Sequence, residues 1–249
     1  MAVSIDTVYQ RVLAILNKEQ RGYVTPQEFN LFANQAQLDI FEQYFYDINQ
    51  FGRLSGNDTE FSDMLNILNE KINIFETTSD MVWANNYWNP PANLYRMGSI
   101  VYENTITTKS LYPTPNTVVT TKVPVEVERI NYNEYLYIAQ SGMTKPTNSR
   151  PVFVANTEGY KVYGATEVTL ADVKCNYIKK PNEAAWSYQM VFGEALYDST
   201  TSTDFELHPS EETELVTKIL EFASLAIEDI QMYQVAAGME AQTNQQEKS

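Results

Sequence analysis

The spacing of apolar residues changes twice along this chain, and this change limits the possible fold more than any other feature of the sequence. Toward both ends, apolar residues recur every three or four positions, as they do in helices with one buried face. From the breaker Asn89-Pro90-Pro91 to Tyr177, the chain is rich in Val, Thr, Tyr and Ile, and the period moves toward two. The pattern predicts an α+β fold in which N-terminal helices and a long C-terminal helix flank a small antiparallel β-domain.

Four regions are expected from these changes in pattern. They are an N-terminal helical region at 1–78, a β-rich region at 79–182, a C-terminal helical region at 183–237, and an extended or disordered tail at 238–249. The tail is polar and has no period, so we expect that only a neighbouring molecule would order it.

Helices are expected at both ends of the chain. The first covers 4–17, the second runs from Thr25 to the Asn49–Gly52 region, and the third covers 61–75. The C-terminal helix opens at Glu211, with acidic residues at its positive end, and runs to about Ala237. Its expected buried stripe comprises Val216, Ile219, Leu220, Ala223, Ile227 and Ile230.

Strands are expected throughout the middle region. Residues 118–129 look like a strand pair interrupted at Pro124, and 132–141 is ambiguous, with a short helix capped by Asn131 or Asn133 as one interpretation. A hairpin is expected from strands at 150–155 and 160–164, joined by the turn at Glu158-Gly159. The last strands are expected at 168–170 and 173–178.

The segment from Asn17 to Glu28 has the length of a calcium-binding loop, with Gly22 at its sixth position and Glu28 at its twelfth. However, Arg21 occupies the fifth position, and a guanidinium cannot ligate a cation. Thr25-Pro26-Gln27-Glu28 instead has a capping residue, a proline at the first helical position and a glutamate at the third. A capping box explains these residues without a metal, so no metal site is predicted.

The net charge bears on the class of partner. Lysine and arginine total 17 against 32 acidic residues, a formal net charge of −15, and no basic run is longer than Lys179-Lys180. Proteins that grip nucleic acid neutralise phosphates with clustered basic residues, so DNA binding is not expected. The acidity would suit a wall past which DNA slides, or it would only keep the protein soluble.

Compartment and membrane association are limited by two further observations. Cys175 is the only cysteine, which excludes an intrachain disulfide and a thiolate metal cluster. No apolar run approaches the roughly 18 residues that cross a bilayer, so no membrane association is expected.

Residues that could carry catalysis are few and are better explained structurally. The only histidine is His208, beside Pro209 at a helix start, where we expect a capping or surface role. Glu211-Glu212 suits the positive end of a helix. Asp198, Asp204 and Glu206 lie in a Ser/Thr-rich loop, and the sequence does not place any two carboxylates face to face. We therefore expect no enzyme activity, and assign no catalytic, cofactor-binding or metal-ligating residue and no cofactor.

Aromatic side chains gather before and within the β-rich region. Trp83, Tyr87, Trp88 and Tyr95 could stack on sugars or bases. Core packing or a contact between subunits is the favoured use of such rings.

Several stretches resemble bacteriophage structural proteins. The segments 150–163 and 173–186, the latter with the exit Tyr-Ile-Lys-Lys-Pro … Trp, look like a β-domain of podophage virion proteins. Phe205-Glu206-Leu207-His208-Pro209, which leads into the helix 211–233, is similar to the C-terminal helix of head–tail connector (portal adaptor) proteins. Residues 17–43 resemble structural proteins of crAss-like phages.

The resemblance implies an adaptor or tail-tubular layout and a head–tail connector function. The chain would be one subunit of a twelvefold ring that joins the capsid portal to the tail and extends the channel for genome ejection. Its partners would be copies of itself, the portal and other neck or tail proteins, and double-stranded DNA would pass through the lumen without specific binding. Such a protein is assembled in the host cytoplasm and resides in the virion. The alternatives are another neck or tail ring or a stopper, and a carbohydrate-binding tail module.

The expected ordering of the tail by a neighbour leads to a first prediction. Deletion of residues 239–249 should weaken ring assembly and leave the thermal unfolding of the monomer unchanged. Native mass measurement and circular dichroism of the shortened protein check this, and intact rings from the shortened protein would contradict it.

Overall fold

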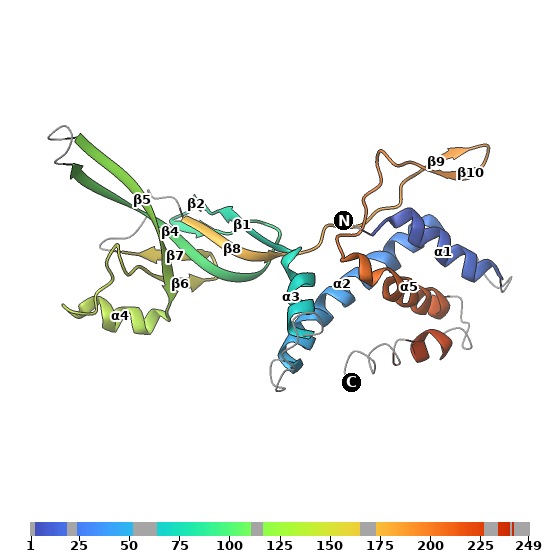
Figure 1. The fold of residues 1–249 in the computed structure, drawn as a ribbon, viewed down its shortest axis with the longest axis horizontal. Helices are drawn as coiled ribbons and strands as arrows, with labels where there is room; N and C mark the ends of the chain where they lie inside the picture. Colours follow the sequence, from blue (N-terminus) through green and yellow to red (C-terminus); the bar gives the residue numbers. More distant parts are fainter. Residues whose placement is uncertain are drawn as a thin grey trace. The chain divides into compact units, whose positions relative to one another are not determined.

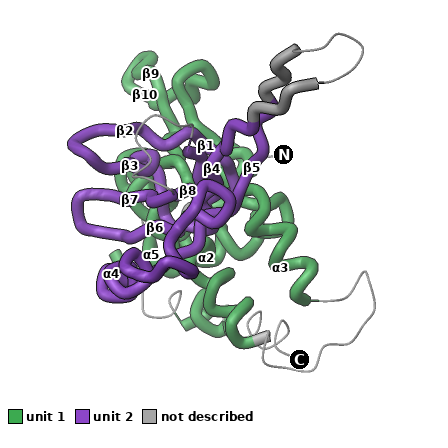
Figure 2. Tube along the Cα trace, turned by 90° about the vertical axis from the view of Figure 1, so that its left-hand side faces the viewer, with its two compact units in different colours: residues 1–74, 181–249 green, residues 75–180 purple. Residues whose placement is uncertain are grey.

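The computed structural model describes residues 3–18, 24–51, 64–110, 117–164, 173–226, 234–239 and 241. It contains two compact units (Figure 2). The helical unit comprises residues 1–74 and 181–249, and the β unit comprises residues 75–180. The helical regions at the two ends of the chain therefore belong to one unit, into which the β unit is inserted.

The helical unit is built mainly from four α-helices (Figure 1). They are α1 (Ile5–Lys18), α2 (Pro26–Phe51), α3 (Met64–Asn73) and α5 (Glu212–Ala226), the last preceded by the short 3₁₀ helix η1 (Pro209–Glu211). Helix α2 packs against α3 and α5, and α1 packs against α5. The fully buried side chains of this core include Ile5, Val8, Phe29, Ile40, Phe41, Leu215 and Ile219. The hairpin β9 (Tyr188–Val191) and β10 (Glu194–Tyr197) completes the unit.

The helical predictions are confirmed over the described residues, with shorter ends. The capping box at the start of α2 is present, because Thr25 N donates to Glu28 Oε2 at 2.9 Å and Glu28 N donates to Thr25 Oγ1 at 3.3 Å. Helix α3 ends at Asn73 and not at residue 75, because Phe75 is fully buried in the β unit. Helix α5 is described as far as Ala226, and residues 234–239 are again helical. Residues 61–63 and 227–233, and most of the tail from 240, lie outside the described residues.

Three side-chain amides on α2, those of Asn30, Asn34 and Gln37, form an amide ladder that joins the N-terminal part of the helical unit to its C-terminal part. Asn34 Nδ2 donates to Ala184 O, and Ala184 N donates back to Asn34 Oδ1, both at 2.9 Å. One turn earlier, Asn30 makes the same exchange with Trp186, at 3.2 and 2.8 Å. One turn later, Gln37 donates to Asn182 O at 2.8 Å and accepts from Glu206 N at 3.1 Å. The three amides therefore bind an extended backbone along the helix much as a neighbouring strand would.

The β unit contains an eight-stranded sheet with strand order β1-β8-β4-β5-β6-β7-β3-β2. The strands are β1 (Glu76–Asp80), β2 (Val82–Ala84), β3 (Tyr87–Asn89), β4 (Leu94–Ser110), β5 (Thr117–Arg129), β6 (Val152–Asn156), β7 (Gly159–Tyr163) and β8 (Val173–Lys179). Their pairings are antiparallel except for that of β5 with β6. The fold thus combines helices with a mostly antiparallel sheet, and the sheet is larger than the small β-domain that the sequence predicted.

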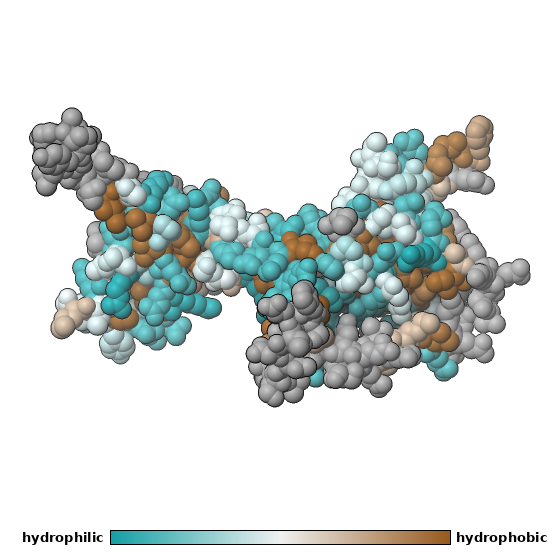
Figure 3. All heavy atoms as spheres, in the orientation of Figure 1, coloured by the Kyte–Doolittle hydropathy of each residue, from teal (hydrophilic) through white to brown (hydrophobic). Residues whose placement is uncertain are grey.

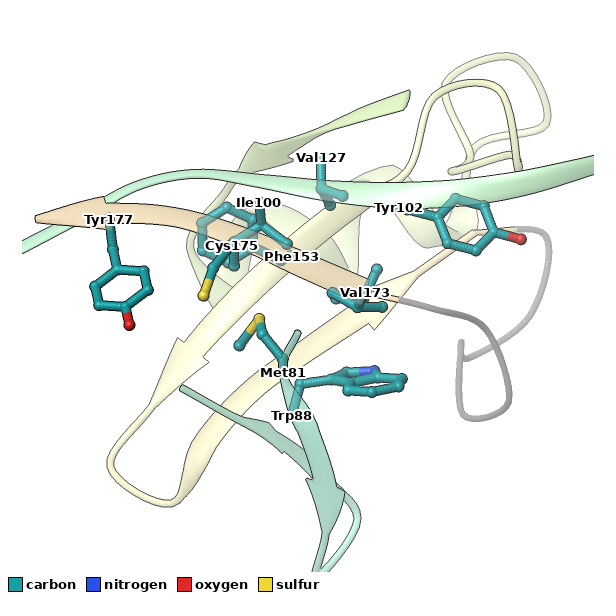
Figure 4. Close-up of a cluster of buried hydrophobic side chains, with 10 residues drawn as sticks. Met81, Trp88, Ile100, Tyr102, Val127, Phe153, Val173, Cys175 and Tyr177 are labelled. Atoms are coloured by element: carbon teal, nitrogen blue, oxygen red, sulfur yellow. The ribbon is translucent and has the colours of Figure 1, made fainter. Parts of the chain in front are cut away.

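The core of the β unit gathers side chains from strands far apart in the sequence. Ile100 on β4, Phe153 on β6 and Cys175 on β8 meet Met81 and Trp88 (Figure 4). Burial raises the pKa of the Cys175 thiol above its ordinary value, and the thiol donates to Ser79 O at 3.7 Å. The single cysteine is therefore a core residue.

Several local predictions for the β-rich region are confirmed and two are wrong. The expected hairpin of β6 and β7 forms, but its turn is Thr157-Glu158 and not Glu158-Gly159, because Gly159 already pairs with Asn156. Helix α4 (Tyr132–Gln140) resolves the ambiguous segment. The predicted interruption at Pro124 is absent, because β5 runs through it opposite Glu103. A proline is tolerated there because β6 pairs with β5 only at Glu128 and Arg129, which leaves the other side of β5 at Pro124 without a paired strand among the described residues. The predicted strand at 168–170 lies outside the described residues.

Part of β4 and β5 forms an arm that extends beyond the sheet (Figure 1). Strand β4 pairs with β8 only as far as Tyr102 and Val173. Beyond that point, Glu103–Ser110 and Thr117–Pro124 pair with each other in an unbroken antiparallel register. These two segments and the residues between them form the β4–β5 arm.

The amide ladder generates a second prediction. Gln37 is 1% exposed, and Gln37→Met would remove both of its hydrogen bonds and leave the Glu206 N–H and the Asn182 carbonyl without that partner. The free energy of unfolding of the helical unit should fall by about 2–3 kcal/mol. The matched control is Gln35→Met on the exposed side of the same helix, where Gln35 Nε2 donates to Asp39 Oδ1 at 2.8 Å, and it should change stability by less than about 0.5 kcal/mol. Equal effects in urea denaturation would contradict the role of the ladder.

Candidate functional site

An aromatic groove lies in the helical unit between α1, the start of α2 and the β9–β10 hairpin. Its volume is about 700 Å³. Tyr9 and Trp186 are buried at its base, where their ring centroids lie 4.1 Å apart. Half-buried Tyr188 and Tyr197 stack on Trp186, with ring centroids 5.8 and 5.7 Å away. The rest of the lining includes Leu13, Pro26, Met190 and Leu196.

Hydrogen bonds hold the central ring of this groove in one orientation. Trp186 Nε1 donates to Asp6 Oδ1 at 3.0 Å, and the Trp186 backbone is held by Asn30 of the amide ladder. The next residue is also fixed, since Ser187 N donates to Ser202 Oγ at 3.0 Å. The buried indole supports Tyr188 and Tyr197, and the half-buried rings of these two tyrosines offer apolar faces on which rings or prolines can stack.

The hairpin beside the groove carries an exposed hydrophobic tip. Phe192 and Gly193 form the two-residue turn between the paired Val191 and Glu194, with φ angles of 53° and 90°. Phe192 is fully exposed at 105%, and exposed Met190 and Leu196 lie nearby on the strands. Figure 3 shows hydrophobic atoms gathered over this hairpin. The tip therefore presents an apolar surface to the outside.

The turn conformation at Phe192 is unusual for a bulky residue. Left-handed backbone costs an L-residue about 1–2 kcal/mol, and Gly, Asn and Asp are the residues that adopt it readily. The two-residue turn between β2 and β3, which is also left-handed, uses Asn85 and Asn86, with φ angles of 54° and 66°. Phe192 therefore lowers the stability of the isolated protein in two ways, by its left-handed backbone and by the exposure of its apolar ring to water.

The three acidic residues of the Ser/Thr-rich loop are used to hold the helical unit together. Asp204 Oδ1 accepts from Ile5 N at 2.9 Å, at the start of α1. Glu206 accepts from the backbone and side-chain amides of Asn182 at 3.1 and 2.8 Å. Asp198 accepts from Thr200 N and Oγ1 at 3.0 and 2.6 Å and from Gln189 Nε2 at 2.9 Å. These bonds hold the pKa of Asp198 at about 2, below its ordinary 3.8.

The predicted capping role of His208 is confirmed. His208 Nδ1 accepts from Ser210 N at 3.3 Å, where His208 precedes η1. The neighbouring Glu211 is buried at 3% exposure and pairs with Lys71 Nζ at 2.7 Å, while Glu212 pairs with Arg11 at 2.9 Å. These side chains fasten α5 to α3 and α1.

The aromatic residues singled out in the β unit are used mainly in packing. Trp88 is 5% exposed in the core, and Trp83 packs on it with ring centroids 5.1 Å apart. Tyr87 lies under Lys161 Nζ at 5.0 Å, and Tyr95 contacts Arg96 at 5.6 Å. Core packing is therefore confirmed for the two tryptophans. A cavity of about 520 Å³ lies elsewhere in the β unit, lined by residues that include Met97, Glu126 and Arg129.

Charge is divided unevenly between the two units. The helical unit holds 7 lysines and arginines against 23 acidic residues, a formal charge of −16, whereas the β unit holds 10 against 9, a formal charge of +1. Any electrostatic attraction to a partner will therefore differ in sign and strength between the units.

The groove and the hairpin tip were not predicted from the sequence. Tyr188 and Tyr197 come together because they lie opposite each other in the β9–β10 hairpin, and the amide ladder holds Trp186 beside them. The signal that could have revealed the tip is Phe192-Gly193 between two short apolar runs, with Phe in a place where turns favour Asn or Asp.

Comparisons with known proteins did not assign the chain to a family. No protein-family model matches it, and no curated protein matches its sequence. Among the described residues, no cluster of three or more His, Cys, Asp and Glu side chains is arranged to hold a metal ion. Within the same residues, none of the helices has both the length and the hydropathy to cross a bilayer.

The environment of Asp198 generates a third prediction. Because the folded state lowers this pKa to about 2, ionised Asp198 stabilises the loop above pH about 4, and this contribution is lost as the pH falls toward 2. Asp198→Asn should therefore unfold at a lower temperature than the parent protein at pH 6, with a difference that shrinks between pH 4 and pH 2. A carboxyl NMR titration gives the direct measurement, and a midpoint near 4 would contradict the prediction.

Proposed function

We propose that this chain is a non-catalytic virion structural protein, a subunit of the ring that joins the capsid portal to the phage tail and extends the DNA channel. The resemblance of residues 17–43, 150–163 and 173–186 to phage structural proteins, and of residues 205–233 to head–tail connector proteins, supports the proposal. The helices around an inserted antiparallel sheet are compatible with the adaptor or tail-tubular layout. In this proposal the protein is assembled in the host cytoplasm and resides in the virion neck.

The exposed Phe192 is the observation that carries the assembly role. A fully exposed phenylalanine in a left-handed turn lowers the stability of an isolated subunit, and a partner that covers it would recover that loss. A ring subunit needs two different surfaces that complement each other on neighbouring copies. The apolar hairpin provides a candidate for one of them.

The acidity of the helical unit fits a channel component. A surface of one sign repels the phosphates of DNA at short range and does not hold them, so DNA would slide past it. The same charge is poorly suited to docking on an anionic membrane.

The aromatic groove favours one alternative, a carbohydrate-binding tail module. Stacked tyrosines beside a tryptophan are a platform that sugar rings can use. Glycan binding by the monomer would support this alternative, and another neck or tail ring or a stopper would share the ring-forming behaviour proposed here.

Electron microscopy and native mass measurement test the proposal. The full-length protein is purified, imaged in negative stain alone and with candidate portal protein, and weighed intact. We expect closed rings, alone or capping the portal, with a single copy number. Monomers that ignore the portal at all concentrations would overturn the connector function.

A fourth prediction separates assembly from folding. Phe192→Asn places a residue suited to the turn at the hairpin tip, so the monomer should gain about 0.5–1 kcal/mol of stability while ring formation weakens. Leu31→Asn on α2 is the control, because Leu31 is also exposed, at 71%, but lies in regular helix. If Phe192→Asn assembles as well as the parent protein, the hairpin tip is not an assembly contact.

A further inference from the structure

The β4–β5 arm has the form of a segment that needs a partner. Its two strands pair only with each other among the described residues. Two-stranded hairpins without further packing are marginally stable in water. On its apolar face, the exposed fraction is 42% for Ile106 and 37% for Val123. An arm of this kind is stabilised when its end docks on another surface.

The apex of the arm has a distinctive composition. Between Ser110 and Thr117, which are paired, the sequence is Leu111-Tyr112-Pro113-Thr114-Pro115-Asn116, and these six residues lie outside the described part of the chain. Closely spaced prolines beside a tyrosine favour extended conformations and dock on grooves lined by aromatic rings. The apex therefore has the chemistry of a ligand for such a groove.

The aromatic groove of the helical unit matches this ligand. Its base is the buried pair of Tyr9 and Trp186, its wall is formed by the half-buried Tyr188 and Tyr197, and its volume of about 700 Å³ suits a few residues of extended chain. The indole is fixed by Asp6, so little ordering of this ring is required on binding.

Charge also suits this pairing. The arm contains Lys109, Lys122 and one acidic residue, Glu103, which pairs with Lys122 at 3.2 Å. The helical unit that holds the groove has a formal charge of −16. Lys109, two residues before the apex in the sequence, would therefore be attracted to the surroundings of the groove.

The lengths of chain involved favour a groove on a different copy. Leu94 at the start of β4 pairs with Lys179, beside the point where the chain leaves the β unit. The 17 residues of β4 then give a contour of about 50 Å to the end of the arm. Trp186 follows Lys180 so closely in sequence that the chain between them spans at most about 20 Å. An arm this much longer than the connection to the groove is suited to reach a neighbour.

We propose that the apex of the β4–β5 arm, residues 111–116, docks in the aromatic groove of a second copy of this chain. The inference rests on the proposed ring, for which it names the contact. Because the arm and the groove lie on different units, each copy would give its arm to one neighbour and receive an arm from the other. Such a head-to-tail contact closes into a ring when the rotation between copies is right.

Cross-linking between labelled copies tests the contact, and this is the fifth prediction. Thr114→Cys is made in one full-length preparation and Leu196→Cys, at the exposed rim of the groove, in an isotopically labelled one. The two are mixed before assembly and treated with a short bis-maleimide. Each preparation alone and the parent protein, whose Cys175 is fully buried, provide the background. We expect a product that contains one chain of each kind.

Substitutions at the apex provide a second readout. Pro113→Ser with Pro115→Ser should lower the yield of the cross-linked product by about tenfold, because the stacked rings are lost. Pro124→Ser, lower on the same arm, is the control and should leave the yield unchanged. Circular dichroism of each variant verifies that the fold is retained.

Each outcome bears on the contact separately from the ring. Rings that form without the mixed product would overturn the arm–groove contact and leave the proposed function standing. A chain carrying both cysteines that cross-links only within itself would also overturn it. The mixed product without closed rings would support the contact and contradict the connector function.

Discussion

The exchange of hydrogen bonds between the amide ladder of α2 and the extended segment 182–186 is the interaction on which the helical unit depends. A helix ordinarily satisfies its own backbone and offers nothing to a passing chain. Here Asn30, Asn34 and Gln37 supply donors and acceptors in a line, so the backbone that returns from the β unit is satisfied along one side of the helix. This contact sets the position of Trp186, and hence of the aromatic groove and the hairpin beside it.

Acidic residues reinforce the same contact between the N-terminal and C-terminal parts of the helical unit. Asp204 binds the start of α1, Glu206 binds Asn182, and Asp6 binds the Trp186 indole. Glu211 is buried with Lys71, so loss of the lysine would leave a charge without its ion-pair partner. The carboxylates that the sequence offered as candidates for catalysis are thus engaged in hydrogen bonds and ion pairs that hold the fold together.

The elements that could be predicted from sequence are those whose determinants are local. The start of α2 follows from Thr25 and Glu28, and the β6–β7 hairpin follows from alternating residues around Gly159, whose φ of 139° few other residues adopt. The strand β1 could not be foreseen, because its polar residues form a strand only by pairing with β8 about a hundred positions later. The groove could not be predicted for the same reason, since Tyr9 and Trp186 are far apart in the sequence and come into contact only in the folded chain. The predicted interruption at Pro124 was wrong because a strand tolerates a proline on a side that carries no paired strand, and the sequence does not show which side of β5 is paired.

The insertion of the β unit between two parts of the helical unit imposes an order on synthesis. Asn34 and Ala184, which exchange hydrogen bonds, are 150 positions apart. At about 5–20 residues per second, a ribosome takes roughly 8–30 s to add the second after the first. Throughout that interval the apolar faces of α1 and α2 await their partner helix α5, while the complete β unit emerges and has all its strands available. The inserted β unit therefore has all of its residues before the helical unit does, and the helices that are waiting for α5 are the segment that a cellular chaperone has reason to shield.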